Sequence, residues 1–216
     1  MYFNRLLENK ITQIRKPYGF DTPEWCKDFL NQIEYIQQEW KTYRLNRDAG
    51  TPIDELSKDQ ESLNTDKKWK SVLLYGYGYS NDKELAHFPV TAGIIKAHQE
   101  QLTLVMFSIT EAGKHIPPHH GNNSGVLRLQ IGIDIPEPDQ CTLRVEDKKV
   151  ALKEKEIFIF DDTFEHELMN GSQSHRAVLI IDYYKPLPFL YRILNKRKIA
   201  KIAQSNYVQS VINKIK

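Results

Sequence analysis

Residues 126–135 alternate between apolar and polar side chains, in the order Val126-Leu127-Arg128-Leu129-Gln130-Ile131-Gly132-Ile133-Asp134-Ile135. Because successive side chains of a β-strand point to opposite faces, this stretch predicts a strand with one packed face and one polar face. A polar inner face is what a ligand cavity inside a barrel needs. The segment therefore predicts a strand that lines a binding cavity.

Further strands are predicted on both sides of this segment, because short apolar or alternating runs are separated by turn signals. The turn signals are Glu111-Ala112-Gly113-Lys114, Pro136-Glu137-Pro138-Asp139 and Asn170-Gly171-Ser172. The predicted strands cover residues 102–110, 141–146, 157–160, 166–169 and 176–184. Many short strands with this punctuation favour a β-sandwich or jelly roll over residues 101–186.

The regions before and after this core are predicted to be mainly helical. In residues 1–100, Thr22-Pro23-Glu24 resembles a helix start. A stripe at helical spacing follows it, formed by Cys26, Phe29, Leu30, Ile33, Ile36, Trp40 and Tyr43. A polar loop is predicted at 47–69, a strand at 72–78 and a short helix at 90–100. Residues 187–216 predict a helical tail, in which positions 192–216 hold seven Lys or Arg and no Asp or Glu.

Length and composition predict one globular domain over residues 1–216. The 216 residues carry a net charge of +2, so no global field favours nucleic acid or a membrane. The two cysteines suit a cytoplasmic location. The sequence has no apolar run long enough to span a membrane and no signal peptide. The basic tail leaves peripheral membrane contact open, although a basic run is more often a solvated helix face.

Two of the seven histidines lie in unusual surroundings. His119 follows two prolines in His115-Ile116-Pro117-Pro118-His119-His120-Gly121, and His166 lies in the acidic segment 161–167. Neutral imidazole is a common ligand of Fe, Zn, Cu and Ni. On neighbouring strand ends of a jelly roll, the pair predicts a metal site. His115, His120 and His175 are predicted not to be ligands.

Iron oxygenases usually add a carboxylate ligand, in many enzymes two residues after the first histidine, where this chain has Gly121. Either the site uses two protein ligands, or the metal is not iron. Arg176 opens a strand ten residues after His166, and its two-pronged guanidinium suits a dicarboxylate. Ser108 and Thr110 share one face of their strand and can add hydroxyl groups.

These segments resemble the aspartyl/asparaginyl β-hydroxylase family of Fe(II)- and 2-oxoglutarate-dependent dioxygenases. The resemblance covers about residues 68–187, through the blocks 108–109, 113–121, 127–136 and 160–167, followed by Arg176 and Asp182. It implies a double-stranded β-helix core, that is, a cupin-like jelly roll. Several matched blocks in the same order make the resemblance specific.

The resemblance assigns roles to individual residues. It implies that His119 and His166 are the catalytic iron ligands, and that the glycine at 121 belongs to a site without the usual carboxylate. It implies that Arg176 and Ser108 hold the distal carboxylate of 2-oxoglutarate and that Arg128 lines the site. Gln130 departs from the family, which has histidine there in contact with the cosubstrate.

The implied reaction is hydroxylation of an unactivated C–H bond with Fe(II), 2-oxoglutarate and O2. The substrate is left open among a peptide Asp or Asn side chain, a small molecule and a lipid acyl chain. Three alternatives also stay open at this point: a 2-oxoglutarate-dependent halogenase, a non-catalytic metal-binding jelly-roll protein, and a zinc hydrolase. Oligomeric state is not predicted.

Overall fold

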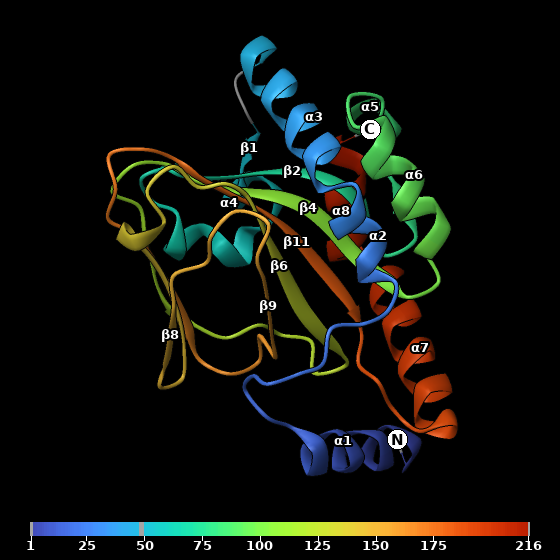
Figure 1. Cartoon of the computed structure of the whole chain (residues 1–216). Coiled ribbons are helices and arrows are strands. Elements are labelled where there is room, and N and C mark those ends of the chain that lie inside the picture. The colour runs from blue at the N-terminus through green and yellow to red at the C-terminus, as the bar shows by residue number, and fades with distance from the viewer. Residues whose placement is uncertain (1, 48–49, 216) are drawn as a thin grey trace.

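Two antiparallel β-sheets form the centre of the computed structural model, which describes residues 2–47 and 50–215. The larger sheet has the strand order β1-β2-β4-β11-β6-β9, with β3 paired to β2. The smaller sheet has the order β5-β10-β7-β8. This mainly antiparallel β architecture with flanking helices confirms the predicted jelly-roll fold class (Figure 1).

The strands lie close to the predicted ranges. In the larger sheet they are β1 (Thr51–Pro52), β2 (Trp69–Gly76), β3 (Tyr79–Ser80), β4 (Leu102–Thr110), β6 (Val126–Asp134), β9 (Ile157–Phe160) and β11 (Arg176–Tyr184). In the smaller sheet they are β5 (His115–His119), β7 (Cys141–Val145), β8 (Lys148–Val150) and β10 (His166–Asn170). The prediction missed four strands: β1 and β3 have two residues each, β5 holds two prolines, and β8 is short and charged.

The alternation of β6 separates two environments, as predicted. Leu127, Leu129, Ile131 and Ile133 belong to one buried cluster, which also includes apolar side chains from the N-terminal helices. Arg128 and Gln130 lie on the opposite face, toward the smaller sheet. The larger sheet therefore has a helix-covered outer face and an inner face that carries polar groups.

Helices α2 (Cys26–Asn31), α3 (Ile33–Asn46) and α6 (Pro89–His98) lie over the outer face of the larger sheet (Figure 1). The indole ring of Trp40 stacks on Phe107 of β4 with ring centroids 4.8 Å apart, and Phe88 lies at the same distance from Phe107. Six of the seven residues of the predicted stripe are buried, and Leu30 is partly buried. These contacts join the region 1–100 to the sheet core.

Two predictions for the region 1–100 need correction. The helix begins at Cys26, after a turn in which the Cys26 amide donates to the carbonyl of Pro23, so Thr22 does not cap it. The stretch 47–69 is not a plain loop: apart from 48–49, which lie outside the described residues, it contains β1, α4 (Ile53–Leu56) and η1 (Lys58–Leu63). The region is otherwise mainly helical, as predicted, and the strand predicted at 72–78 is present as β2, which pairs along β4 inside the larger sheet.

The remaining helices are α1 (Tyr2–Ile14), α5 (Asp82–Leu85), η2 (Pro138–Gln140), α7 (Phe189–Ala203) and α8 (Asn206–Ile215). The apolar side chains of Leu7 and Ile11 on α1 pack with Leu187, which precedes α7. The predicted C-terminal helix is thus two helices. No helix in the described part of the chain is long and apolar enough to cross a bilayer.

Candidate active site

His119 and His166 are direct cross-strand partners in the smaller sheet. His119 ends β5 and His166 begins β10, and the register pairs the two residues. Their ring centroids lie 4.1 Å apart. Strands 47 residues apart in sequence therefore bring the two predicted ligands together, with the ring of Phe160 5.3 Å from His166.

The hydrogen bonds of both imidazole rings select the same tautomer. Nδ1 of His119 lies 2.8 Å from the carbonyl oxygen of Pro117, and Nδ1 of His166 lies 3.0 Å from that of Phe164. A carbonyl only accepts, so each Nδ1 carries the proton and each Nε2 keeps its lone pair. Burial lowers the pKa of His119, and burial with the neighbouring His119 lowers the pKa of His166 to about 3. Two neutral rings with free Nε2 atoms fit a transition metal.

No third side chain in the described residues joins His119 and His166 as a candidate metal ligand. Within the described residues, no group of three or more His, Cys, Asp and Glu side chains could hold a metal ion. The Asp162 side chain explains why glycine fits at position 121. A Cβ atom there would overlap the carboxylate of Asp162, and the Gly121 amide donates to the Asp162 carbonyl at 2.6 Å. A carboxylate side chain at 121 would therefore require the buried Asp162 side chain to move.

Asp162 is a site residue that the sequence reasoning named only as a member of the acidic segment around His166. Its side chain is buried, and its Oδ1 atom has no hydrogen-bond partner among the described residues. Burial raises the pKa of Asp162 to about 6, although the nearby Arg128 opposes the shift. An unsatisfied buried carboxylate oxygen beside a cavity is a group that a ligand or a water molecule can complete.

The Arg128 guanidinium contacts two carboxylates. Its Nε and Nη2 atoms donate to the two oxygens of Asp182 at 2.8 Å each, and Nη2 lies 3.2 Å from Asp162. The register places Arg128 opposite Asp182, so β6 and β11 build this fork together. Arg128 lines the cavity, as the resemblance implies, and its Nε and Nη2 atoms are engaged by carboxylates.

Arg176 is buried without a carboxylate partner among the described residues. Its Nη2 atom donates to the amide oxygen of Gln130 at 3.1 Å, and both side chains are at most 5% exposed. Burial lowers the pKa of Arg176 to about 10. Thr110 is its cross-strand partner, with a hydroxyl 3.5 Å from the Arg176 carbonyl. A buried cation held by a neutral amide is a favourable place for an anion.

Ser108 lies on the same inner face and touches an indole rather than an arginine. The Nε1 atom of Trp69 donates to the Ser108 hydroxyl oxygen at 3.0 Å. The Trp69 ring lies 6.3 Å from the ring of His119. Trp69 is therefore a second residue that the sequence reasoning missed, since β2 was predicted to begin only at residue 72.

A cavity of about 260 Å³ opens between the two sheets in front of the histidines. Its lining includes His119, His166, Arg128 and Asp162. Ser108, Thr110, Gln130 and Arg176 are not in that lining. Aliphatic side chains form much of the remaining wall, including Leu104, Met106 and Val126 from the sheet and Val208, Val211 and Ile212 from α8. This candidate catalytic cavity, called the catalytic cavity below, thus combines two histidines suited to metal binding with an apolar wall.

The three histidines that were predicted not to be ligands, His115, His120 and His175, make other contacts. His115 contacts Glu167 at 2.7 Å, His175 contacts Asp134 at 2.7 Å, and Nδ1 of His120 lies 3.3 Å from the Thr163 carbonyl. Only His120 also lines the catalytic cavity. Their exclusion from the ligand set stays a prediction.

A family model and several related proteins of known name resemble this sequence, and all of them are hydroxylases. The sequence model described as aspartyl/asparaginyl beta-hydroxylase matches residues 31–186. The ornithine lipid ester-linked acyl 2-hydroxylase of Rhizobium tropici is 33% identical over 192 residues, which cover 88% of this chain and 68% of that protein. The aspartyl/asparaginyl beta-hydroxylases of Mus musculus and Homo sapiens are each 26% identical over 173 residues.

The mammalian matches cover 76% of this chain but 23% of those proteins, so the chain spans less than a quarter of their length. Among solved structures, the cupin domain of a transcriptional regulator from Enterobacter cloacae is similar with a TM-score of 0.39 and 10% identity. That match covers 55% of this chain and 99% of the other.

Proposed function

The chain belongs to the aspartyl/asparaginyl β-hydroxylase family, and we propose that it hydroxylates an unactivated C–H bond with Fe(II), 2-oxoglutarate and O2. The observation that carries this proposal is the cross-strand pair of neutral histidines, of which His166 is buried and His119 is partly buried. His119 and His166 would hold iron through their Nε2 atoms. When bound, iron with 2-oxoglutarate and O2 supplies the oxidising chemistry, and the protein supplies position and a dry cavity.

The surroundings of Gly121 support a site with two protein ligands. The Asp162 carboxylate occupies the space that a side chain at 121 would need. A negative group there also disfavours chloride, which a halogenase would have to bind beside the metal. The Asp162 oxygen without a partner would accept a hydrogen bond from a water molecule near the histidines.

Arg176 supports the choice of 2-oxoglutarate as cosubstrate. Its guanidinium is buried, faces the inner side of the larger sheet and lacks a carboxylate partner in the described part of the chain. A carboxylate of the cosubstrate would satisfy that charge through paired hydrogen bonds. The hydroxyls of Ser108 and Thr110 lie on the same face and would add donors, and Gln130 would orient the guanidinium.

The apolar wall of the catalytic cavity supports a substrate that presents an aliphatic segment to the histidines. Side chains from α8, β4 and β6 would exclude water from a hydrocarbon chain at this place. The relative from Rhizobium tropici is named for hydroxylation of a lipid acyl chain. We therefore place a lipid acyl chain ahead of a peptide side chain as the substrate. The cytoplasmic location stays a prediction.

Metal binding by histidine variants tests the proposal independently of the substrate. His119→Ala and His166→Ala are each expected to lose stoichiometric Fe(II) binding in equilibrium dialysis under anaerobic conditions. His115→Ala is the matched control, because His115 is in the same strand but pairs with Glu167. Unchanged iron binding in both ligand variants would contradict the assignment. The unmodified protein should also convert 2-oxoglutarate to succinate when an acyl lipid is added.

A further inference from the structure

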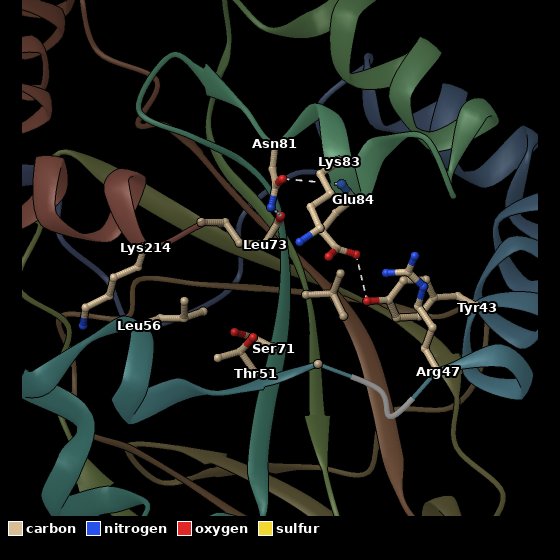
Figure 2. A pocket seen from close by; sticks show the side chains of 12 residues that line it. Tyr43, Arg47, Thr51, Leu56, Ser71, Leu73, Asn81, Lys83, Glu84 and Lys214 are labelled. Carbon is tan, nitrogen blue, oxygen red and sulfur yellow. Dashed lines mark hydrogen bonds between the residues drawn. The ribbon is translucent and has the colours of Figure 1, made fainter. Parts of the chain in front are cut away.

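A second cavity of about 450 Å³ lies at the edge of the larger sheet, next to the catalytic cavity. It opens along the β2 edge between β1, which pairs at residues 70–71, and β3, which pairs at 75–76. The end of α3 and the start of α5 form its outer side (Figure 2). We call it the side cavity.

The outer side of the side cavity is charged. Arg47 and Lys83 contribute two cations, and neither has a carboxylate partner among the described residues. Glu84 is the one acidic residue of the lining within residues 2–47 and 50–215, and its Oε2 accepts from the Tyr43 hydroxyl at 2.8 Å (Figure 2). Lys214 contributes its stem, because its ammonium group donates to the Glu55 carbonyl at 2.6 Å. Among the described residues, this side therefore carries two cations and one carboxylate, and the Arg47 guanidinium also lies 5.7 Å from the Tyr43 ring.

The inner side of the side cavity leads to the catalytic cavity. Leu56, Ser71 and Leu73 line both cavities. Ser71 is 1% exposed, and its hydroxyl oxygen has no hydrogen-bond partner in the described structure. A buried hydroxyl without a partner is costly unless a ligand or water completes it. The shared boundary is thus apolar, with one free hydroxyl.

We propose that the side cavity binds an acidic group, a phosphate or a carboxylate, of a substrate whose aliphatic chain passes Ser71 to reach the histidines. The arrangement suits an amphiphile. Cations lie at the outer side, aliphatic side chains line the way inward, and His119 and His166 lie at the inner end. Arg47 and Lys83 bind the acidic group, and Ser71 donates to a polar atom of the chain or its linkage. The proposal rests on the hydroxylase function proposed above.

Calorimetric titration of metal-free protein tests the side cavity with decyl phosphate, decanoate and decanol, each below its micelle concentration. Arg47→Gln/Lys83→Gln should weaken binding of decyl phosphate, decanoate or both at least tenfold, because the variant lacks both cationic contacts to the acidic group. Binding of uncharged decanol should not change. The two acidic probes separate a phosphate site from a carboxylate site. Lys41→Gln/Lys96→Gln is the charge-matched control, since both lysines are exposed and outside either lining.

An equal loss in the control, or no loss in Arg47→Gln/Lys83→Gln, would overturn the proposal. Ser71→Leu tests the connection between the cavities: decyl phosphate should bind at least tenfold more weakly, while ethyl phosphate, which needs only the outer side, should not. Ser71→Val repeats the test with a smaller side chain if the leucine variant is unstable. Equal effects on both probes would show that the chain does not pass Ser71.

The titrations do not depend on turnover, so the two proposals fail separately. Charge-dependent binding of decyl phosphate without any succinate production would contradict the hydroxylase function and leave the acidic subsite standing. Succinate production with an acyl lipid, but with unchanged binding in Arg47→Gln/Lys83→Gln, would remove the subsite alone.

Discussion

Arg128 and Arg176 lie on the same inner face of the larger sheet, yet their surroundings are opposite. Arg128 is held by two carboxylates, and these raise its pKa despite burial. Arg176 is held by the amide of Gln130, and burial lowers its pKa. A compensated guanidinium stabilises the fold, whereas an uncompensated one is kept for a ligand. The difference separates structural charge from functional charge within one sheet.

Substitution of Arg128, the arginine paired with carboxylates, should change the free energy of unfolding most. Arg128→Met leaves Asp162 and Asp182 buried without their cation, so the free energy of unfolding should fall by about 3–5 kcal/mol. Arg176→Met removes an unpaired charge and should cost less than about 1 kcal/mol, or stabilise the protein. Urea denaturation of the two variants measures both values. Equal losses would erase the distinction between the two arginines.

Removing the uncompensated arginine should affect the cosubstrate instead. Arg176→Met should raise the KM for 2-oxoglutarate about a hundredfold, since a paired, charged contact is lost. Addition of 2-oxoglutarate should raise the Tm of the iron-loaded unmodified protein but not that of Arg176→Met. The Arg176→Lys variant is the control for charge without the fork geometry, and an unchanged KM in both variants would rule out the anchor.

Supplying Arg176 with a carboxylate should make it resemble Arg128. In Gln130→Glu, the new carboxylate lies where the amide oxygen now accepts from Arg176. It would compete with the cosubstrate, so the KM for 2-oxoglutarate should rise about tenfold. Gln130→Met, which removes the hydrogen bond without adding charge, is the matched control. If the KM for 2-oxoglutarate rises by a similar factor in both variants, the cause is the lost orientation of the Arg176 guanidinium and not the added negative charge.

The smallest effect is expected at Ser108. Its hydroxyl accepts from Trp69 and lies on the face of Arg176, so Ser108→Ala removes one neutral hydrogen bond. The KM for 2-oxoglutarate should rise about threefold to tenfold, which corresponds to about 1 kcal/mol. Trp69→Phe breaks the same bond from the other side. If it changes the KM as much as Ser108→Ala does, then Ser108 acts through the indole.

The strands were predictable because their signal is local. The alternation of residues 126–135 survives intact in β6, since one face packs under the helices and the other faces the smaller sheet. Strand β5 was missed because Pro117 and Pro118 hide its pattern. The start at Thr22 was wrong because a turn ending at Cys26 comes first. In these two places the local sequence alone does not determine the backbone conformation.

The sequence by itself determined most strands of the core and the family, and it singled out His119, His166 and Arg176, because alternation and motif spacing can be recognised along the chain. Only the tertiary structure decided which charges are compensated. Asp182 and Asp162 reach Arg128 across 54 and 34 positions of sequence, while Arg176 meets an amide. Long-range packing likewise sets Asp162 against Gly121 and brings α8 to the cavity wall. Such contacts depend on how the sheets pair and face each other, which local patterns do not specify.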